Sequence, residues 1–207
     1  AETYENMEDV LTHQETFMKA DRAAAERKVD DLLWNMITVS DNESCNELGR
    51  LQSEKHDFLD GAEKVNEYLK KEGYENTSYQ STLHPSSSPK LNLGGHNTTT
   101  VRDCGILLEK IFRGECVSEE ASAEMLELLM NQKNTAKIPA GISADIPIAN
   151  KTGETDSESA RYGNCVWSKK LTYILCVMSE DFKSGAEAID NIRSISGVVY
   201  KLSESST

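Results

Sequence analysis

The pattern of apolar residues changes near Gly141, and this change constrains the fold more than any other feature of the chain. The first forty residues contain no Gly or Pro and repeat apolar residues such as Leu33 and Met36 at helical spacing. After Gly141 the sequence predicts three antiparallel strands, rich in β-branched, aromatic and other apolar residues: Ile146–Lys151, Tyr162–Trp167 and Leu171–Met178. We therefore expect an α/β chain of the α+β type, with a mainly helical domain over residues 1–145 and the strands plus a closing helix over 146–207.

Capping residues divide the helical part into segments. A second helix is expected just after Asp41-Asn42, with an apolar face formed by Cys45, Leu48 and Leu51. Asp60-Gly61-Ala62-Glu63 resembles a capping pair that opens a third helix, which runs to Gly73. Two more helices are expected to begin at the caps Thr100 and Ser118, and the closing helix runs from Gly185 with its apolar residues Ala188, Ile189, Ile192, Ile195 and Val198.

Residues 74–99 differ from the helical segments on either side of them. Asn, Ser, Thr, Gly and Pro dominate this stretch, and no apolar period survives in it. A structureless stretch of this length is uncommon inside a compact domain, and where it occurs it is more often functional than idle. The sequence therefore predicts a long loop with a functional role between two helices.

Charge and cysteine spacing exclude several classes of protein. Lys and Arg total 22 against 35 Asp and Glu, a formal net charge of −13, so the surface repels nucleic acid. The longest strongly apolar run, Leu171–Met178, is too short to span a bilayer. No Cys-x-x-Cys spacing supports a zinc site among the five cysteines, which are Cys45, Cys104, Cys116, Cys165 and Cys176. We expect no metal, no organic cofactor and no nucleic-acid partner.

Two short polar motifs lie at the ends of predicted elements. Ser40-Asp41-Asn42 joins two predicted helices, and Lys151-Thr152-Gly153-Glu154 ends a predicted strand. Either motif alone is weak evidence, because Ser-Asp-Asn is a common helix cap and Lys-Thr-Gly an ordinary strand end. Together with a Ser-x-x-Lys they form the signature of class A β-lactamases and penicillin-binding proteins. The flanking segments Leu32–Leu48 and Ile138–Thr155 resemble clostridial-type members of these serine hydrolases, and the similarity covers essentially the whole chain.

The resemblance implies a site for acyl transfer to a serine. It implies that Ser40 relays a proton toward the leaving nitrogen, that Lys151 supplies a fixed positive charge, and that Asp41 braces the turn. Four further residues are implied to hold the substrate: Asn42 through its carboxamide, Thr152 through its hydroxyl, Gly153 by allowing close approach to the strand edge, and Glu154 through a backbone N–H that is one of two oxyanion donors.

The family's Ser-x-x-Lys nucleophile has no counterpart upstream of Ser40, because no serine precedes that residue. Thr16-Phe17-Met18-Lys19 is a near match, but it lies closer to Ser40 than the family pattern allows, and threonine is a poor nucleophile. Ser87-Ser88-Pro89-Lys90 fits the pattern but follows Ser-Asp-Asn instead of preceding it. We interpret Ala1 as not the natural start, with the nucleophile helix and two strands lost. The intact protein is then expected to be an enzyme, and this chain alone to be inactive.

In the family, the two lost strands flank the strand predicted at Leu171–Met178. Their loss would leave a bare apolar edge, and such edges pair with other chains. We therefore expect the chain to self-associate or to bind its missing N-terminal segment through this edge.

A second departure concerns deacylation, for which class A enzymes use a glutamate in the loop between the two motifs. Residues 76–101 contain no Asp or Glu, and Ser88 stands where the resembling Glu-Pro-x-Leu-Asn segment has its glutamate, with Asn92 retained. His84 is the only nearby group with a useful pKa, and an exposed loop histidine is its simpler interpretation. The sequence therefore predicts slow deacylation, which is typical of a penicillin-binding protein or D,D-peptidase.

The leading interpretation is a β-lactamase-like serine hydrolase that forms an acyl-enzyme with β-lactams or D-Ala-D-Ala-like peptides. A non-catalytic module of the same fold that binds cell-wall fragments is the first alternative, since it would retain the same substrate-binding residues. A serine-dependent glutaminase and a purely structural helical protein are weaker alternatives. Because the family works outside the cytoplasmic membrane, the resemblance implies an extracytoplasmic or secreted protein.

Overall fold

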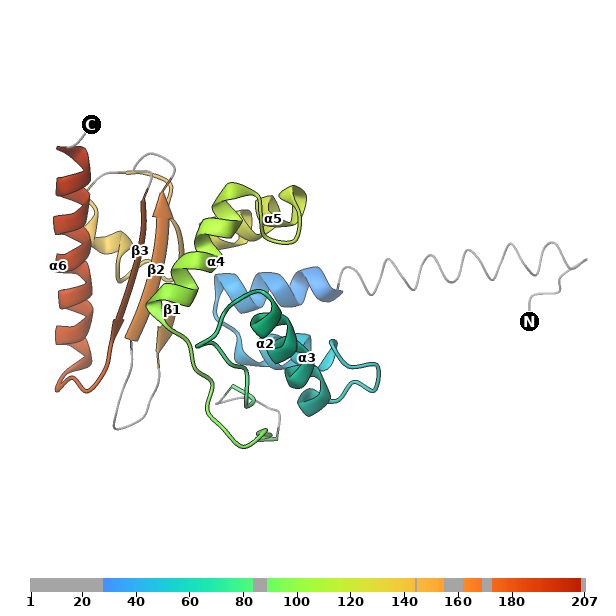
Figure 1. Ribbon diagram of the computed structural model, residues 1–207. Coiled ribbons are helices and arrows are strands. Elements are labelled where there is room, and N and C mark those ends of the chain that lie inside the picture. Colours follow the sequence, from blue (N-terminus) through green and yellow to red (C-terminus); the bar gives the residue numbers. More distant parts are fainter. Residues whose placement is uncertain (1–27, 84–88, 144, 155–161, 169–172, 206–207) are drawn as a thin grey trace, which may run out of the picture.

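The computed structural model describes residues 28–83, 89–143, 145–154, 162–168 and 173–205 (Figure 1). A helix covers residues 28–38. The elements that follow it are α2 (Asn42–Arg50), α3 (Phe58–Lys71), α4 (Val101–Arg113), α5 (Glu119–Met130), the 3-10 helix η1 (Pro139–Gly141), β1 (Ala149–Glu154), β2 (Tyr162–Ser168), β3 (Tyr173–Ser179) and α6 (Gly185–Glu204). This order confirms the predicted succession of a helical block, antiparallel strands and a closing helix.

The described strands form an antiparallel sheet in the order β1-β2-β3, with helices on both faces (Figure 1). Side chains of β3 alternate between these faces, as the two-residue period of a strand requires. Ile174 and Cys176 pack with the core of α4 and α5, whereas Leu175 and Val177 pack against Ile192 of α6. The sheet therefore lies between two helical layers, and each layer has its own apolar cluster.

The first strand begins later than the sequence predicts. Residues 146–148 are not paired, and β1 starts at Ala149 and continues through Glu154. Pro147 gives a physical reason, because its nitrogen carries no hydrogen and cannot donate to a neighbouring strand. As a result, the whole Lys-Thr-Gly-Glu motif lies inside the paired strand, opposite residues 162–165 of β2.

The predicted start of α3 is wrong, and the buried face of α2 is not its apolar one. Helix α3 begins at Phe58 instead of near Asp60, because Asp57 accepts a hydrogen bond from the Asp60 backbone N–H at 2.9 Å and acts as the N-cap. The buried residues of α2 are Ser44, Asn46 and Gly49, and not the expected apolar face of Cys45, Leu48 and Leu51. Gly49 packs closely against Gly61 of α3, whereas the Asn46 side chain bonds the backbone of Leu83.

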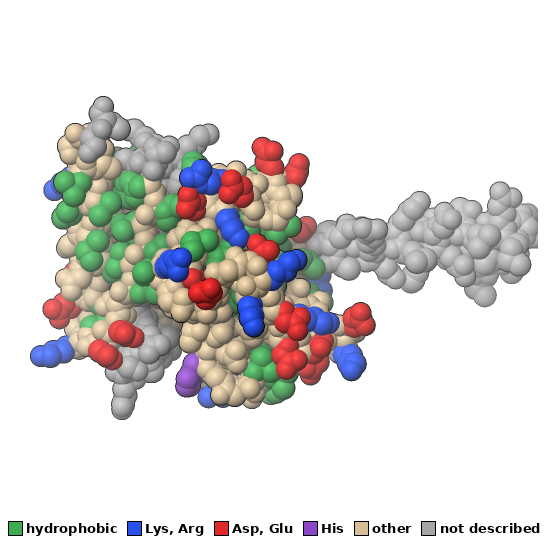
Figure 2. Space-filling model, in the orientation of Figure 1, with side chains coloured by type: hydrophobic (Ala, Val, Ile, Leu, Met, Phe, Trp, Pro, Cys, Tyr) green, Lys and Arg blue, Asp and Glu red, His purple; other side chains and the backbone are tan. Residues whose placement is uncertain are grey.

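The closing helix α6 buries one side only. Ala188 and Ile192 are buried as expected, but Ile195 and Val198 are 43% and 58% exposed, and Leu202 continues the same stripe at 62%. Met178 on the neighbouring β3 is 40% exposed. Figure 2 shows hydrophobic side chains over the α6 and sheet side of the molecule, whereas charged side chains gather over the helices on the other side. None of the helices described is long and apolar enough to cross a membrane.

The long connection between α3 and α4 is better ordered than its composition suggests. Asparagine side chains fix its backbone: Asn66 pairs with the backbone of Tyr79, and Asn97 accepts from the N–H groups of Gln80 and Ser81. Two isolated antiparallel bridges, Ser78 with Thr98 and Ser81 with Asn92, close it into a folded loop. The prediction of a stretch without helix or strand holds for its described residues, but their structure is fixed by side-chain hydrogen bonds.

Candidate active site

Ser40, Asp41 and Asn42 form the sharp turn between the helix at 28–38 and α2. Ser40 has a φ of +59°, in the left-handed region that non-glycine residues rarely adopt. Asp41 is the N-cap of α2, and its carboxylate accepts the Ser44 backbone N–H at 2.7 Å. The structure thus gives Asp41 the bracing position implied by the resemblance, and the turn holds the Ser40 hydroxyl at the surface.

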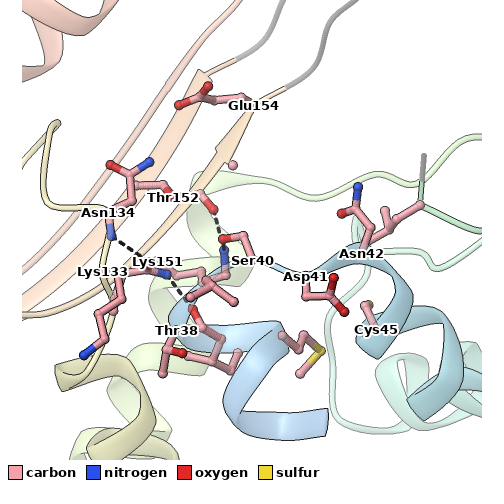
Figure 3. Close-up of a pocket in the computed structure, with 16 residues that line it drawn as sticks. Thr38, Ser40, Asp41, Asn42, Cys45, Lys133, Asn134, Lys151, Thr152 and Glu154 are labelled. Atoms are coloured by element: carbon pink, nitrogen blue, oxygen red, sulfur yellow. Dashed lines mark hydrogen bonds between the residues drawn. The ribbon is translucent and has the colours of Figure 1, made fainter. Parts of the chain in front are cut away.

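Lys151 of β1 reaches this turn from the sheet. Its Nζ donates to the Ser40 Oγ at 2.6 Å and to the Thr152 carbonyl at 2.7 Å (Figure 3). Burial lowers the pKa of the Lys151 ammonium, and the nearby Lys137 charge lowers it further, against an opposing effect of Cys45. The two motifs, 111 positions apart, are therefore joined by a short hydrogen bond between a lysine and a serine.

A pocket of about 850 Å³ opens at this junction. Three segments line most of it: residues 36–42, 132–134 and 151–154, with Cys45 and Leu83 completing the wall. The Lys133 backbone N–H donates to the Thr38 carbonyl at 2.9 Å, which ties the second segment to the first. The volume of the pocket falls within the range of small-molecule sites.

The four predicted substrate-binding residues all line this pocket. Asn42 begins α2 on one side of Ser40, while Thr152, Gly153 and Glu154 follow Lys151 along β1 (Figure 3). A Cβ on Gly153 would meet no atom within 4 Å, so this stretch of strand is open to a ligand. The structure therefore brings all six predicted site residues to one cavity.

Other sequence candidates lie elsewhere. Thr16, His84 and the Ser87–Ser88 pair are outside the described residues. Asn92 does not line the pocket and instead donates to the Gly95 carbonyl at 2.7 Å. Of the described residues of the long loop, Leu83 reaches the pocket, held there by Asn46, which bonds both its N–H and its carbonyl.

The sequence motifs did not point to Lys137, a further lysine beside the pocket. Its side chain is 1% exposed, and its Nζ lies 2.8 Å from a Glu154 carboxylate oxygen and 3.2 Å from the Gly153 carbonyl. Burial lowers the pKa of Lys137, against the opposing effect of Glu154. The resembling segment Ile138–Thr155 begins one residue after Lys137, and no spacing rule pointed to it.

Cys45 was expected on an apolar helix face and instead lines the pocket. Burial raises the pKa of its thiol, and its Sγ lies 3.8 Å from the Tyr79 hydroxyl. Cys45 and Cys116 are free thiols. In the described part of the chain, no group of three or more His, Cys, Asp or Glu residues could hold a metal ion.

Comparison with models of known protein families gives a match over nearly the whole chain. A model of the beta-lactamase enzyme family matches residues 3–202, nearly the whole chain. The chain belongs to the beta-lactamase enzyme family. The predicted resemblance and the β-lactamase-like mixed fold are thereby confirmed.

Solved structures with the same fold share about a fifth to a quarter of their aligned residues with this chain. A penicillin-binding protein, PBP-A, is 24% identical with a TM-score of 0.65, over 86% of this chain and 62% of its own. The β-lactamase from Sphaerobacter thermophilus is 18% identical with a TM-score of 0.67, over 84% and 63%. An ancestral class A β-lactamase is 22% identical with a TM-score of 0.64, over 84% and 65%. The chain thus spans less than two thirds of these structures. A comparison with proteins of curated function found no match.

The backbone of Ser40 leads to a stability prediction that uses a matched pair of variants. Ser40→Ala and Ser40→Gly both remove the hydroxyl that Lys151 contacts, but glycine alone tolerates the left-handed conformation without strain. We expect the glycine variant to be more stable than the alanine variant by about 1 kcal/mol, measured by urea unfolding. An alanine variant as stable as the glycine variant would show that position 40 is not left-handed in solution.

Proposed function

We propose that the protein to which these residues belong is a serine hydrolase that forms an acyl-enzyme with β-lactams or D-Ala-D-Ala-like peptides. In this proposal Ser40 relays a proton, and Lys151 supplies the positive charge of the site. The observation that carries it is the 2.6 Å hydrogen bond from Lys151 Nζ to Ser40 Oγ at the floor of a ligand-sized pocket. A serine hydroxyl that is held by a lysine ammonium can relay a proton toward a leaving group, which acyl transfer requires.

Different residues of the pocket would bind different groups of the ligand. The Asn42 carboxamide offers both a donor and an acceptor to a ligand amide, and Thr152 offers a hydroxyl beside the Lys151 charge. A ligand with an amide at one end and a carboxylate at the other fits this arrangement, and penicillins and acylated D-Ala-D-Ala peptides share those groups. We therefore place the ligand carboxylate at the Lys151–Thr152 end and the backbone N–H of Glu154 near the reacting carbonyl.

The proposed enzyme deacylates slowly. Residues 76–101 contain no acidic side chain that could activate a water, and the described part of this loop brings only Leu83 to the pocket. Without such a general base, the acyl-enzyme is expected to accumulate. This behaviour favours a penicillin-binding protein or D,D-peptidase over an efficient resistance enzyme, and it favours an extracytoplasmic protein that meets cell-wall peptides.

A binding protein without turnover is the second candidate. The observation that favours it is that the proposed ligand-holding residues Asn42 and Thr152 line one pocket, an arrangement that binding alone would require. Such a module would bind cell-wall fragments through Asn42 and Thr152 and would form no covalent product.

Intact-mass spectrometry after incubation with benzylpenicillin tests the proposal. We expect the 207-residue chain to bind without a covalent adduct, and a longer protein that adds a Ser-x-x-Lys segment to gain one penicilloyl group that persists for many minutes. Rapid hydrolysis with no accumulated adduct would contradict slow deacylation. Absence of an adduct despite binding to the longer protein would establish the second candidate.

We also propose that the outer edge of β3 pairs with a further strand, from another part of the protein or from a second copy. Among the described residues no strand pairs with this edge, and apolar side chains lie beside it at Met178 and along α6. The isolated 207-residue chain is expected to self-associate, as measured by light scattering at increasing concentration. A monodisperse monomer at all concentrations would contradict this proposal.

A further inference from the structure

One ion pair at the pocket has no role in the mechanism proposed above. Lys137 leads into η1 and comes to lie against the end of β1. Its side chain is 1% exposed, whereas the Glu154 side chain that it contacts at 2.8 Å is 44% exposed. A buried ammonium is costly unless a negative group accompanies it. Glu154 supplies that group from the wall of the pocket.

Strand geometry places Glu154 on the ligand side of β1. Successive side chains of a strand alternate between faces, so Thr152 and Glu154 share one face. Both residues line the pocket, and Figure 3 shows Glu154 farther along the same strand from Lys151. A ligand carboxylate bound beside Thr152 would therefore lie near the Glu154 carboxylate.

The charged side chains around the pocket determine how well an anionic ligand binds. Its charged lining residues are Lys133 and Lys151 against Asp41 and Glu154, so the positive and negative side chains cancel. Asp41 is engaged in capping α2, which leaves Glu154 as the carboxylate on the strand side. Juxtaposed like charges oppose binding, so Glu154 disfavours an anionic ligand end while it holds Lys137.

We propose that Glu154 is a specificity-determining residue: its carboxylate, held at the pocket wall by the buried Lys137, lies beside the position of the ligand's carboxylate and competes with it for this end of the pocket. An anionic ligand binds only by displacing this side chain or by tolerating its charge. Ligands whose carboxylate is masked as an ester do not meet this competition. The proposal rests on the proposed function for the identity of the ligand, but the competition itself concerns any carboxylate at this end of the pocket.

The test compares the wild-type chain with Glu154→Gln and the double variant Lys137→Met/Glu154→Gln. Glutamine has the same shape and can still accept a hydrogen bond from Lys137, so the buried ammonium keeps an acceptor. Affinity for benzylpenicillin and for its methyl ester is measured by amide-shift titration, with thermal unfolding as the folding control. We expect E154Q to bind benzylpenicillin about tenfold more tightly and the ester within about twofold of wild type, and the double variant to lose the gain. An unchanged affinity, or an equal gain for the ester, would overturn the proposal.

Benzoate, a simple carboxylate, separates this proposal from the proposed function. Tighter benzoate binding to E154Q, with no binding of benzylpenicillin to any variant, would support the role of Glu154 and refute β-lactam recognition. Equal benzylpenicillin binding to wild type and E154Q would refute the role of Glu154 and leave β-lactam recognition intact. A folded E154Q that binds benzoate no better than wild type would also refute competition between Glu154 and a ligand carboxylate.

Discussion

Replacing Lys151 with methionine is expected to lower the affinity for benzylpenicillin about 100-fold. The substitution removes the ammonium that contacts Ser40 Oγ and faces the proposed carboxylate position, and loss of such a buried charged contact costs about 3 kcal/mol. The chain should stay folded, because methionine occupies similar space and removes a charge that burial disfavours. Amide-shift titration measures the affinity, and thermal unfolding checks the fold.

Lys64→Met is the matched control for this variant. It removes the same charge from an exposed position on α3, where Lys64 pairs with Asp60 at 3.3 Å. Its effect on affinity is expected to stay within about twofold, since exposed charges far from the site are screened by salt. Comparable losses in the two variants would show that net charge, and not the position of Lys151, governs binding.

The lowered pKa of Lys151 gives the binding reaction a pH dependence of defined sign. The folded protein loses the Lys151 proton below the ordinary lysine pKa, because burial disfavours the charged form. Affinity for benzylpenicillin should therefore be full below that lowered pKa and fall as the pH rises through it. Lys151→Arg keeps its charge and should remove this fall. An unchanged pH profile in the arginine variant would assign the titration to another group.

Replacing Gly61 with alanine is expected to destabilise the protein by at least about 3 kcal/mol. A Cβ at this position of α3 would lie 1.9 Å from the Gly49 carbonyl oxygen of α2, so the two helices would have to separate. Because α2 begins at Asn42, this contact also supports the pocket wall. The change in the urea midpoint measures the loss.

Gly105→Ala is the control, because Gly105 lies in α4 and a Cβ there meets no atom within 4 Å. Alanine in an unobstructed helix position raises stability by about 0.5–1 kcal/mol. The two substitutions, identical in chemistry, should thus shift the urea midpoint in opposite directions. A Gly61→Ala variant as stable as wild type would show that α2 and α3 are not in close contact.

Local chemistry explains which parts of the fold could be predicted. Thr100 and Ser118 cap α4 and α5 as expected, since capping depends on residues within one turn. Burial depends on partners distant in sequence, and the apolar spacing of α2 and α6 does not show which of their residues are buried. The buried residues of α2 are small or polar, and part of the apolar stripe of α6 is exposed at Val198 and Leu202.

The six site residues could be found because two motifs have a fixed spacing and order in a known family. Lys137 could not be found in this way, because its position depends on how η1 packs against α6 and the end of β1. Cys45 was assigned to a helix face by periodicity alone, and the rotation of α2 decides that it lines the pocket. Motifs therefore identify residues that line the pocket, and tertiary packing decides which further side chains lie beside them.

The central claim is that the turn at 40–42 and the strand at 151–154 form one ligand-binding cleft. Amide-shift mapping of the isotope-labelled chain during a titration with benzylpenicillin tests it most directly. We predict that backbone amides of both segments shift together with a single dissociation constant, and that the Lys151→Met chain shows neither change. Shifts confined to one segment, or located outside both, would contradict the claim.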